Sequence, residues 1–156
     1  MYSLIEIIRC MKCFGIFVFL MLLLSCNNDR RNSSLNAEDK LYLRIVFEDF
    51  FQNDLLDLWI NDKKILETDS LNSSFSDGVT NTAIYIYSRE GKQIVKVHDN
   101  TISIPIKDSL VHLSIQLNNK DIKFDINPRY GIYVGLNKKK DGTLRIAQNE
   151  SQPLYD

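Results

Sequence analysis

The chain of 156 residues is poor in the side chains that form disulfides and zinc sites. Its three cysteines are all among the first 26 residues, and its two histidines are His98 and His112. Residues 27–156 therefore cannot form a disulfide with one another, and a zinc site, which needs closely spaced Cys and His ligands, is not supported. We expect ordinary surface histidines and a core that is stable without cross-links, since about 115 residues are enough to build one.

Excess positive charge and catalytic motifs are missing as well. Lys and Arg total 19 against 20 Asp and Glu, without the basic stripe that follows a phosphate backbone, so no nucleic-acid partner is expected. The sequence contains no Gly-x-Ser-x-Gly elbow, no His-Glu-x-x-His helix and no phosphate-binding glycine loop. We therefore expect a protein that is not an enzyme, although a pair of facing carboxylates stays open as a route to hydrolysis.

One long apolar run is present, from Cys13 to Leu24, and Arg9 and Lys12 precede it. A basic region followed by 7–15 apolar residues is typical of an export signal. A membrane-spanning helix, which needs about 20 apolar residues, is a weaker alternative. An ordinary secretory signal is another, but it wants an Ala-x-Ala-like cleavage site, and the first alanine is Ala37. Met11 stays open beside Met1 as the true start.

The end of this run, Leu23-Leu24-Ser25-Cys26, resembles the lipobox of bacterial lipoproteins. The resemblance covers only the first sixth of the chain. It implies that residues 1–25 are removed and that Cys26 becomes the lipid-carrying first residue of the mature protein. Each buried methylene contributes roughly 0.8 kcal/mol, so two or three acyl chains would form a lasting membrane anchor. Asn27 is not the aspartate that retains some lipoproteins in the inner membrane, which favours the outer membrane of the cell envelope.

Three segments follow from this interpretation. Residues 1–25 are the signal peptide, residues 26–40 are the lipidated cysteine with a flexible tether, and residues 41–156 are a single domain. The tether is rich in Asn, Ser and charge and has too little apolar surface to offset the entropy of ordering it. Without residues 1–25 the chain keeps 17 basic and 19 acidic residues of the 19 and 20 in the full sequence.

From Leu41 onward the dominant pattern is alternation of apolar and polar residues between turns rich in Asn, Asp and Gly. This period of two predicts strands with one buried face, which is the habit of antiparallel sheets. The pattern favours an all-β antiparallel sandwich of eight to ten strands, immunoglobulin-like or jelly-roll-like, with the strand order open. Asn61-Asp62 predicts a hairpin, Pro105 predicts an edge strand, and residues 50–58 are the one place where a helical turn is expected.

Aromatic residues form the first candidate site. By the alternation, Trp59, Tyr85, Tyr87 and Tyr133 point away from the core, and Gly131 and Gly135 would leave a shallow depression beside Tyr133. Exposed rings suit stacking on a sugar or packing against a partner protein. The alternative is structural, because Tyr and Trp stabilise strands through cross-strand pairs, and a loop or the C-terminal tail would then cover them.

A calcium site is the second candidate, since calcium binds oxygen ligands on loops. The carboxylates that would form it are Asp49, Asp54, Asp57 and Asp62. Their spacing does not match an EF-hand, and Asp is common in turns for conformational reasons alone. We expect no cofactor and keep calcium as a weak alternative.

The sequence thus predicts a cell-envelope lipoprotein whose β-sandwich binds a glycan or a small molecule without catalysis. A second hypothesis is a protein-interaction lipoprotein, an assembly accessory or an inhibitor that uses an exposed sheet edge or loop. An envelope enzyme is third. The sequence does not identify the ligand, the partner or the oligomeric state.

Overall fold

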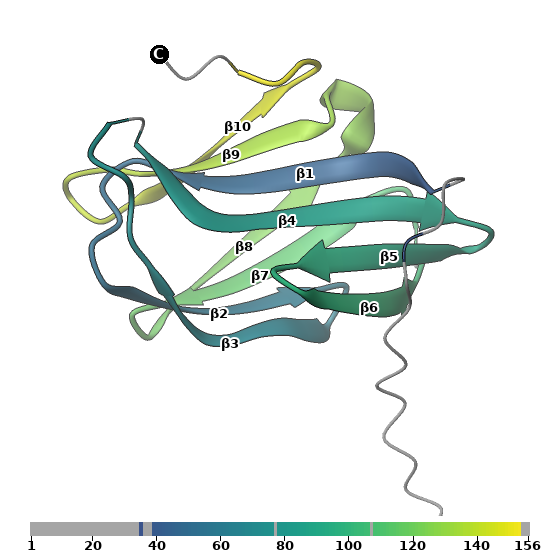
Figure 1. The fold of residues 1–156 in the computed structure, drawn as a ribbon, viewed down its shortest axis with the longest axis horizontal. Coiled ribbons are helices and arrows are strands. Elements are labelled where there is room, and N and C mark those ends of the chain that lie inside the picture. Colours follow the sequence, from purple (N-terminus) through teal and green to yellow (C-terminus); the bar gives the residue numbers. More distant parts are fainter. Residues whose placement is uncertain (1–34, 36–38, 77, 107, 154–156) are drawn as a thin grey trace, which may run out of the picture. The chain divides into compact units, whose positions relative to one another are not determined.

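A computed structural model describes residues 35, 39–76, 78–106 and 108–153. These belong to the second of the two units into which the chain divides, Met1–Arg30 and Arg31–Asp156. The described residues form ten strands and one short 3₁₀ helix (Figure 1). In chain order they are β1 Lys40–Glu48, β2 Asp54–Ile60, β3 Lys63–Leu71, β4 Val79–Arg89, β5 Lys92–Val97, β6 Asn100–Pro105, β7 Val111–Leu117, β8 Lys120–Ile126, η1 Pro128–Tyr130, β9 Tyr133–Lys138 and β10 Leu144–Asn149.

The strands form two sheets that pack face to face, so the predicted all-β sandwich is confirmed (Figure 1). The larger sheet has the order β10-β9-β1-β4-β5-β6 and the smaller one the order β3-β2-β7-β8. All neighbouring strands are antiparallel except β1 and β9, which run parallel. The parallel pair is the one departure from the expected pairing, because two strands so far apart in sequence need no hairpin between them.

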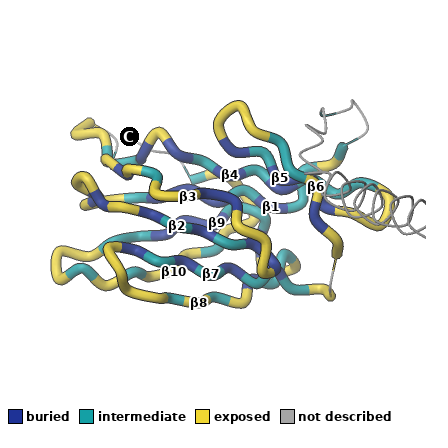
Figure 2. The backbone as a smooth tube through the Cα atoms, turned by 90° about the horizontal axis from the view of Figure 1, so that it is seen from below, coloured by how far each residue is buried: buried dark blue, intermediate teal, exposed yellow. Residues whose placement is uncertain are grey.

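The core lies between the sheets, as Figure 2 shows by the buried segments along the strands. In β2 and β7 the alternation is complete, and every second residue is buried. Burying one Leu, Ile or Phe side chain stabilises the fold by about 1.5–3 kcal/mol. Leu56, Leu58 and Ile60 contribute in this way from β2, and the rings of Phe47 and Phe51 pack edge to face with centroids 5.8 Å apart.

Two hairpins of the smaller sheet close through turns of two residues. Asn61-Asp62 joins β2 to β3 with φ values of 49° and 64°, and Asn118-Asn119 joins β7 to β8 with 48° and 65°. Positive φ at both central residues is the property of a type I′ turn, whose twist matches the flanking strands. The hairpin predicted at Asn61-Asp62 is therefore confirmed.

Pro105 ends β6, an edge strand of the larger sheet, as its missing backbone donor predicts. The helical turn expected within residues 50–58 is wrong. Phe50 and Asn53 have φ values of 49° and 50°, outside the right-handed helical region, and β2 begins at Asp54. The sequence of residues 50–58 is compatible with a helical turn, but residues from Asp54 onward pair with β3 and β7 and are therefore extended.

The predicted signal peptide, the predicted lipobox with Cys26 and most of the predicted tether lie outside the described residues. Within the described part of the chain, none of the helical segments has the length and apolar character needed to span a bilayer.

Candidate functional site

The four predicted aromatic residues lie on different sheets. Trp59 is in β2 of the smaller sheet, where the ammonium group of Lys64 lies 5.3 Å from its ring centroid. Tyr85, Tyr87 and Tyr133 belong to β4 and β9 of the larger sheet. All four are half-buried and each has at least one buried neighbour along its strand, so Trp59 points away from the core on the opposite side of the sandwich from the tyrosines. The four rings do not converge on one site.

Two of the tyrosines do come together, on either side of Arg44. In the strand register Arg44 of β1 lies opposite Tyr85 of β4 and opposite Tyr133 of β9. The guanidinium carbon of Arg44 lies 5.4 Å from the centroid of the Tyr85 ring, within the range of a cation–π contact. The outer face of the larger sheet therefore carries a row of Tyr85, Arg44 and Tyr133 across three neighbouring strands.

The shallow depression expected beside Tyr133 is absent. A side chain at Gly135 would meet the carboxylate of Glu48, and one at Gly131 would meet the backbone of Asn149. The space that the two glycines leave is thus already occupied. The glycines allow other parts of the chain to approach β9 closely, and they do not open a surface for a ligand.

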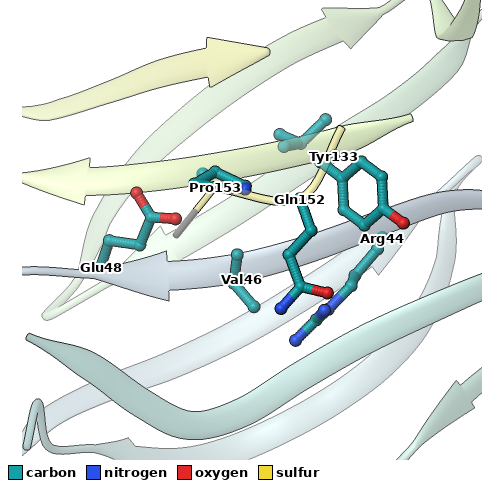
Figure 3. Close-up of a pocket in the computed structure, with 8 residues that line it drawn as sticks. Arg44, Val46, Glu48, Tyr133, Gln152 and Pro153 are labelled. Carbon is teal, nitrogen blue, oxygen red and sulfur yellow. The ribbon is translucent and has the colours of Figure 1, made fainter. Parts of the chain in front are cut away.

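The chain after β10 folds over this row. Gln152 and Pro153 line a narrow crevice together with Arg44, Val46, Glu48 and Tyr133 (Figure 3). The crevice leaves no room for a water molecule, so its own side chains fill it. We call residues Gln152–Pro153 the strap.

An open cavity lies elsewhere among the described residues, at the end of the sandwich where β1 begins. It is a groove of about 480 Å³, which we call the end groove. Ligand pockets typically measure roughly 300–1,000 Å³. Its walls come from the beginning of β1, the end of β4, the loop before β7 and the segment around η1. The lining residues are Lys40, Leu41, Tyr42, Ser88, Ser109, Asn127, Pro128, Arg129 and Ile132.

The end groove combines one aromatic ring with polar and positively charged groups. Tyr42, which also packs against the core, supplies the ring, and among the described lining residues Lys40 and Arg129 are charged. The side chain of Asn127 accepts a hydrogen bond from the backbone N–H of Arg129 at 3.1 Å and so fixes the start of η1. The groove can therefore offer a stacking surface and hydrogen-bond donors to a polar ligand.

The calcium candidates do not assemble into a site. Asp54 is bound by Lys138, and Asp57 accepts hydrogen bonds from Lys64 and from the backbone of Thr68. Asp49 and Asp62 are exposed turn residues with φ values of 61° and 64°. Among the described residues, no group of three or more His, Cys, Asp or Glu side chains is placed to hold a metal ion.

The two histidines lie at the surface, and both contact carboxylates. His98 Nε2 lies 3.2 Å from Asp69 Oδ2. His112 is bound on both sides, with Nε2 3.0 Å from Asp108 Oδ2 and Nδ1 2.8 Å from Asp125 Oδ1. Hydrogen bonds to Asp108 and then to Asp125 raise the pKa of His112 above its ordinary value of 6.5. With both ring nitrogens facing carboxylates, the imidazolium form is favoured, since it alone donates from both.

Sequence reasoning missed Arg44 and the end groove. Arg44 was one polar residue among many on an outward face, and only the pairing of β1 with β9 brings Tyr133 beside it. The end groove is formed by four segments between Lys40 and Ile132, so no pattern within one stretch of sequence predicts it. The strand order would have been needed to predict the contact of Arg44 with its neighbours and the end groove.

Compared with protein-family models, with curated proteins and with solved structures, the chain gives no significant match.

Proposed function

We propose that this protein is a lipid-anchored protein of the bacterial cell envelope whose β-sandwich binds a glycan or a small polar molecule without catalysis. The single observation that carries the binding function is the end groove of about 480 Å³. The lipobox-like sequence at Cys26 carries the anchor. The outer membrane is the favoured location.

The chemistry of the end groove suits a sugar. Pyranose rings have an apolar face that stacks on an aromatic ring and a rim of hydroxyl groups that form hydrogen bonds. The groove offers the ring of Tyr42, and it offers hydroxyl, amide and guanidinium groups from Ser88, Ser109, Asn127 and Arg129. This combination replaces the predicted cluster of Trp59 with the three tyrosines as the candidate binding site.

The position of the groove fits a tethered domain. Lys40 is both the first residue of β1 and part of the groove lining. The segment that would connect the domain to Cys26 ends at this residue. The groove therefore lies at the end of the domain where β1 begins, next in sequence to the proposed tether.

Substitution of the lipidated cysteine tests the anchor. Cys26→Ser removes the thiol that would accept the lipid, so the protein should leave the detergent-soluble membrane fraction and lose the mass of the acyl chains. Cys13→Ser, inside the apolar run, is the matched control and should change neither property. An unmodified Cys26 in the purified native protein, measured by mass spectrometry, would refute the anchor.

Binding to immobilised glycans and to envelope polysaccharides tests the groove. Tyr42→Ala and Arg129→Ala should each weaken retention at least about tenfold, which corresponds to about 1.4 kcal/mol. Tyr130→Ala is the matched control, since Tyr130 is exposed and does not line the groove. Equal binding by the wild type and both groove variants, or no binding to any glycan, would contradict the proposal. Thermal unfolding of each variant separates loss of binding from loss of folding.

One observation favours the protein-interaction alternative. Three apolar side chains are exposed near the opposite end of β1, namely Phe50, Leu55 and Phe75, and Phe75 is fully exposed. The loops that carry the two phenylalanines are joined, since Asp49 N–H donates to the carbonyl of Gly78 at 2.7 Å and Ser73 N–H donates to that of Phe51 at 2.9 Å. Exposed apolar loops are typical of contact sites for other proteins. A photo-crosslinker at position 75 that captures a defined envelope protein in intact cells would favour this alternative.

A further inference from the structure

Arg44 is a charged residue with one buried polar atom that lacks a hydrogen-bond partner among the described residues. This atom is Nε. A buried donor without a partner is costly, and more so when it belongs to a charged group. A guanidinium in such a position is suited to an anion that supplies the missing acceptors.

The surroundings of Arg44 hold its guanidinium in place. The Tyr85 ring lies against one side of it at 5.4 Å, and Tyr133 lies opposite Arg44 on the neighbouring strand. Tyr133 and Arg44 line the same crevice (Figure 3). Because the guanidinium is planar and its donors form a rigid fork, an aromatic contact fixes the direction in which the fork can bind.

Within residues 39–76, 78–106 and 108–153, no carboxylate forms a hydrogen bond with Arg44 Nε. Glu48, four residues further along β1, accepts a hydrogen bond from Asn137 Nδ2 at 3.0 Å and lies over Gly135. On the other side, Lys96 of β5 lies opposite Tyr85 and adds a second positive charge. The outer face around Arg44 therefore favours an acidic ligand.

The strap covers this position without hydrogen bonds to it. Figure 3 shows the side-chain amide of Gln152 directed toward the guanidinium of Arg44. Among the described residues, Gln152 and Pro153 form no hydrogen bond, and they lie against the sheet as part of the crevice lining. Glutamine has the shape of glutamate without its charge. Gln152 therefore occupies the position in which a carboxylate would pair with the guanidinium of Arg44.

We propose that Arg44, with Tyr85 and Tyr133, forms a binding site for a carboxylate group, and that the strap covers this site until the carboxylate displaces it. The ligand is a small free carboxylate or an acidic side chain of a partner protein, and the recognition chemistry is the same. The site is separate from the end groove, so its test does not depend on glycan binding.

The Nε–H signal of Arg44 in ¹⁵N-edited NMR spectra of the whole protein reports on this site directly. It is assigned by its disappearance in Arg44→Lys. Acetate and a blocked peptide with two glutamates are the probes, and at least one of them should shift the signal in a saturable way. Saturation by acetate identifies a small carboxylate as the ligand, whereas saturation by the peptide alone identifies an acidic protein segment.

Variants of the strap make the prediction specific. Gln152→Ala with Pro153→Ala should strengthen probe binding at least about fivefold, because the covered state no longer competes. Gln152→Glu should instead shift the Arg44 signal without any probe, raise the melting temperature and abolish the response to both probes. Ser151→Glu is the matched control, with the same charge one residue away.

Two outcomes would overturn the proposal. One is the absence of a saturable shift with either probe in the strap double variant, provided that its spectrum is that of a folded protein. The other is a Ser151→Glu variant that behaves like Gln152→Glu, since the effect would then come from charge in the tail and not from a fit to Arg44.

Discussion

The ammonium group of Lys138 lies 2.6 Å and 2.7 Å from the two carboxylate oxygens of Asp54 and so joins the two sheets of the sandwich. Lys138 ends β9 in the larger sheet, and Asp54 begins β2 in the smaller one. Asp54 also accepts hydrogen bonds from Asn118 Nδ2 at 2.6 Å and from the backbone of Gln52 at 2.8 Å. All of these groups bind one carboxylate, and Asp54 is only 3% exposed, so the pair forms a buried link between the two sheets.

Removal of the cation should destabilise the fold strongly. In Lys138→Met the Asp54 carboxylate stays buried without its counter-charge, and breaking such a pair costs about 3–5 kcal/mol. We expect the free energy of unfolding, measured by urea denaturation at pH 7, to fall by about 3 kcal/mol.

The neighbouring exposed lysine is the control for this variant. Lys139→Met removes the same charge next to the same turn and should change the free energy of unfolding by less than about 0.5 kcal/mol. Similar losses in the two variants would show that net charge, and not the bond to Asp54, determines the effect.

Acid should weaken the same link. Burial raises the pKa of Asp54, but the bonds from Lys138, Gln52 and Asn118 outweigh it, and the net pKa is below the ordinary value of 3.8. A carboxyl group with a lowered pKa contributes stability that is present above its unfolded pKa and is lost as the pH falls through the folded value. The stability difference between the wild type and Asp54→Asn should therefore be constant above about pH 5 and shrink below about pH 4. A difference that does not change with pH would contradict this.

His112 should give the opposite pH dependence. Its pKa is raised by Asp108 and Asp125, so its contribution is present below the unfolded value of 6.5 and is lost as the pH rises through the folded value. In an NMR titration, Asp108→Asn and Asp125→Asn should each lower the pKa of His112. The stability difference between the wild type and His112→Gln should be larger at pH 5.5 than at pH 8.5. An unchanged pKa in both aspartate variants would mean that the contacts do not form in solution.

The sandwich could be predicted from the sequence because each strand carries its own signal. The alternation in β2 and β7 shows which residues are buried, and Asn61-Asp62 has the residue types that a tight hairpin turn needs. Pro105 marks an edge strand through a missing hydrogen-bond donor. Each of these signals is local, and each depends on the chemistry of one or two residues.

The candidate sites could not be predicted in the same way. Alternation places Trp59 and Tyr133 on outward faces but does not assign them to sheets, and the two sheets face opposite sides. The link between Arg44 and Tyr133 depends on the parallel pairing of β1 with β9, which joins residues 89 positions apart. The depression expected at Gly135 failed because the side chain of Glu48, from another strand, fills it.

The two glycines beside Tyr133 should respond differently to substitution. Gly131 has a φ of 135°, and a Cβ there would meet the backbone of Asn149, which cannot move without breaking the end of β10. A Cβ at Gly135 would meet only the flexible tip of Glu48. We expect Gly131→Ala to lower the free energy of unfolding by about 3 kcal/mol or more, and Gly135→Ala by about 1 kcal/mol, mainly through the lost bond from Asn137 to Glu48.

Gly142→Ala is the control, since Gly142 has a φ of 82° with open space around it, so strain alone should cost about 1 kcal/mol. Urea denaturation of the three variants gives the order of their free energies of unfolding. A Gly131→Ala variant that is no less stable than Gly142→Ala would show that the segment at Asn149 does not pack against β9 as described.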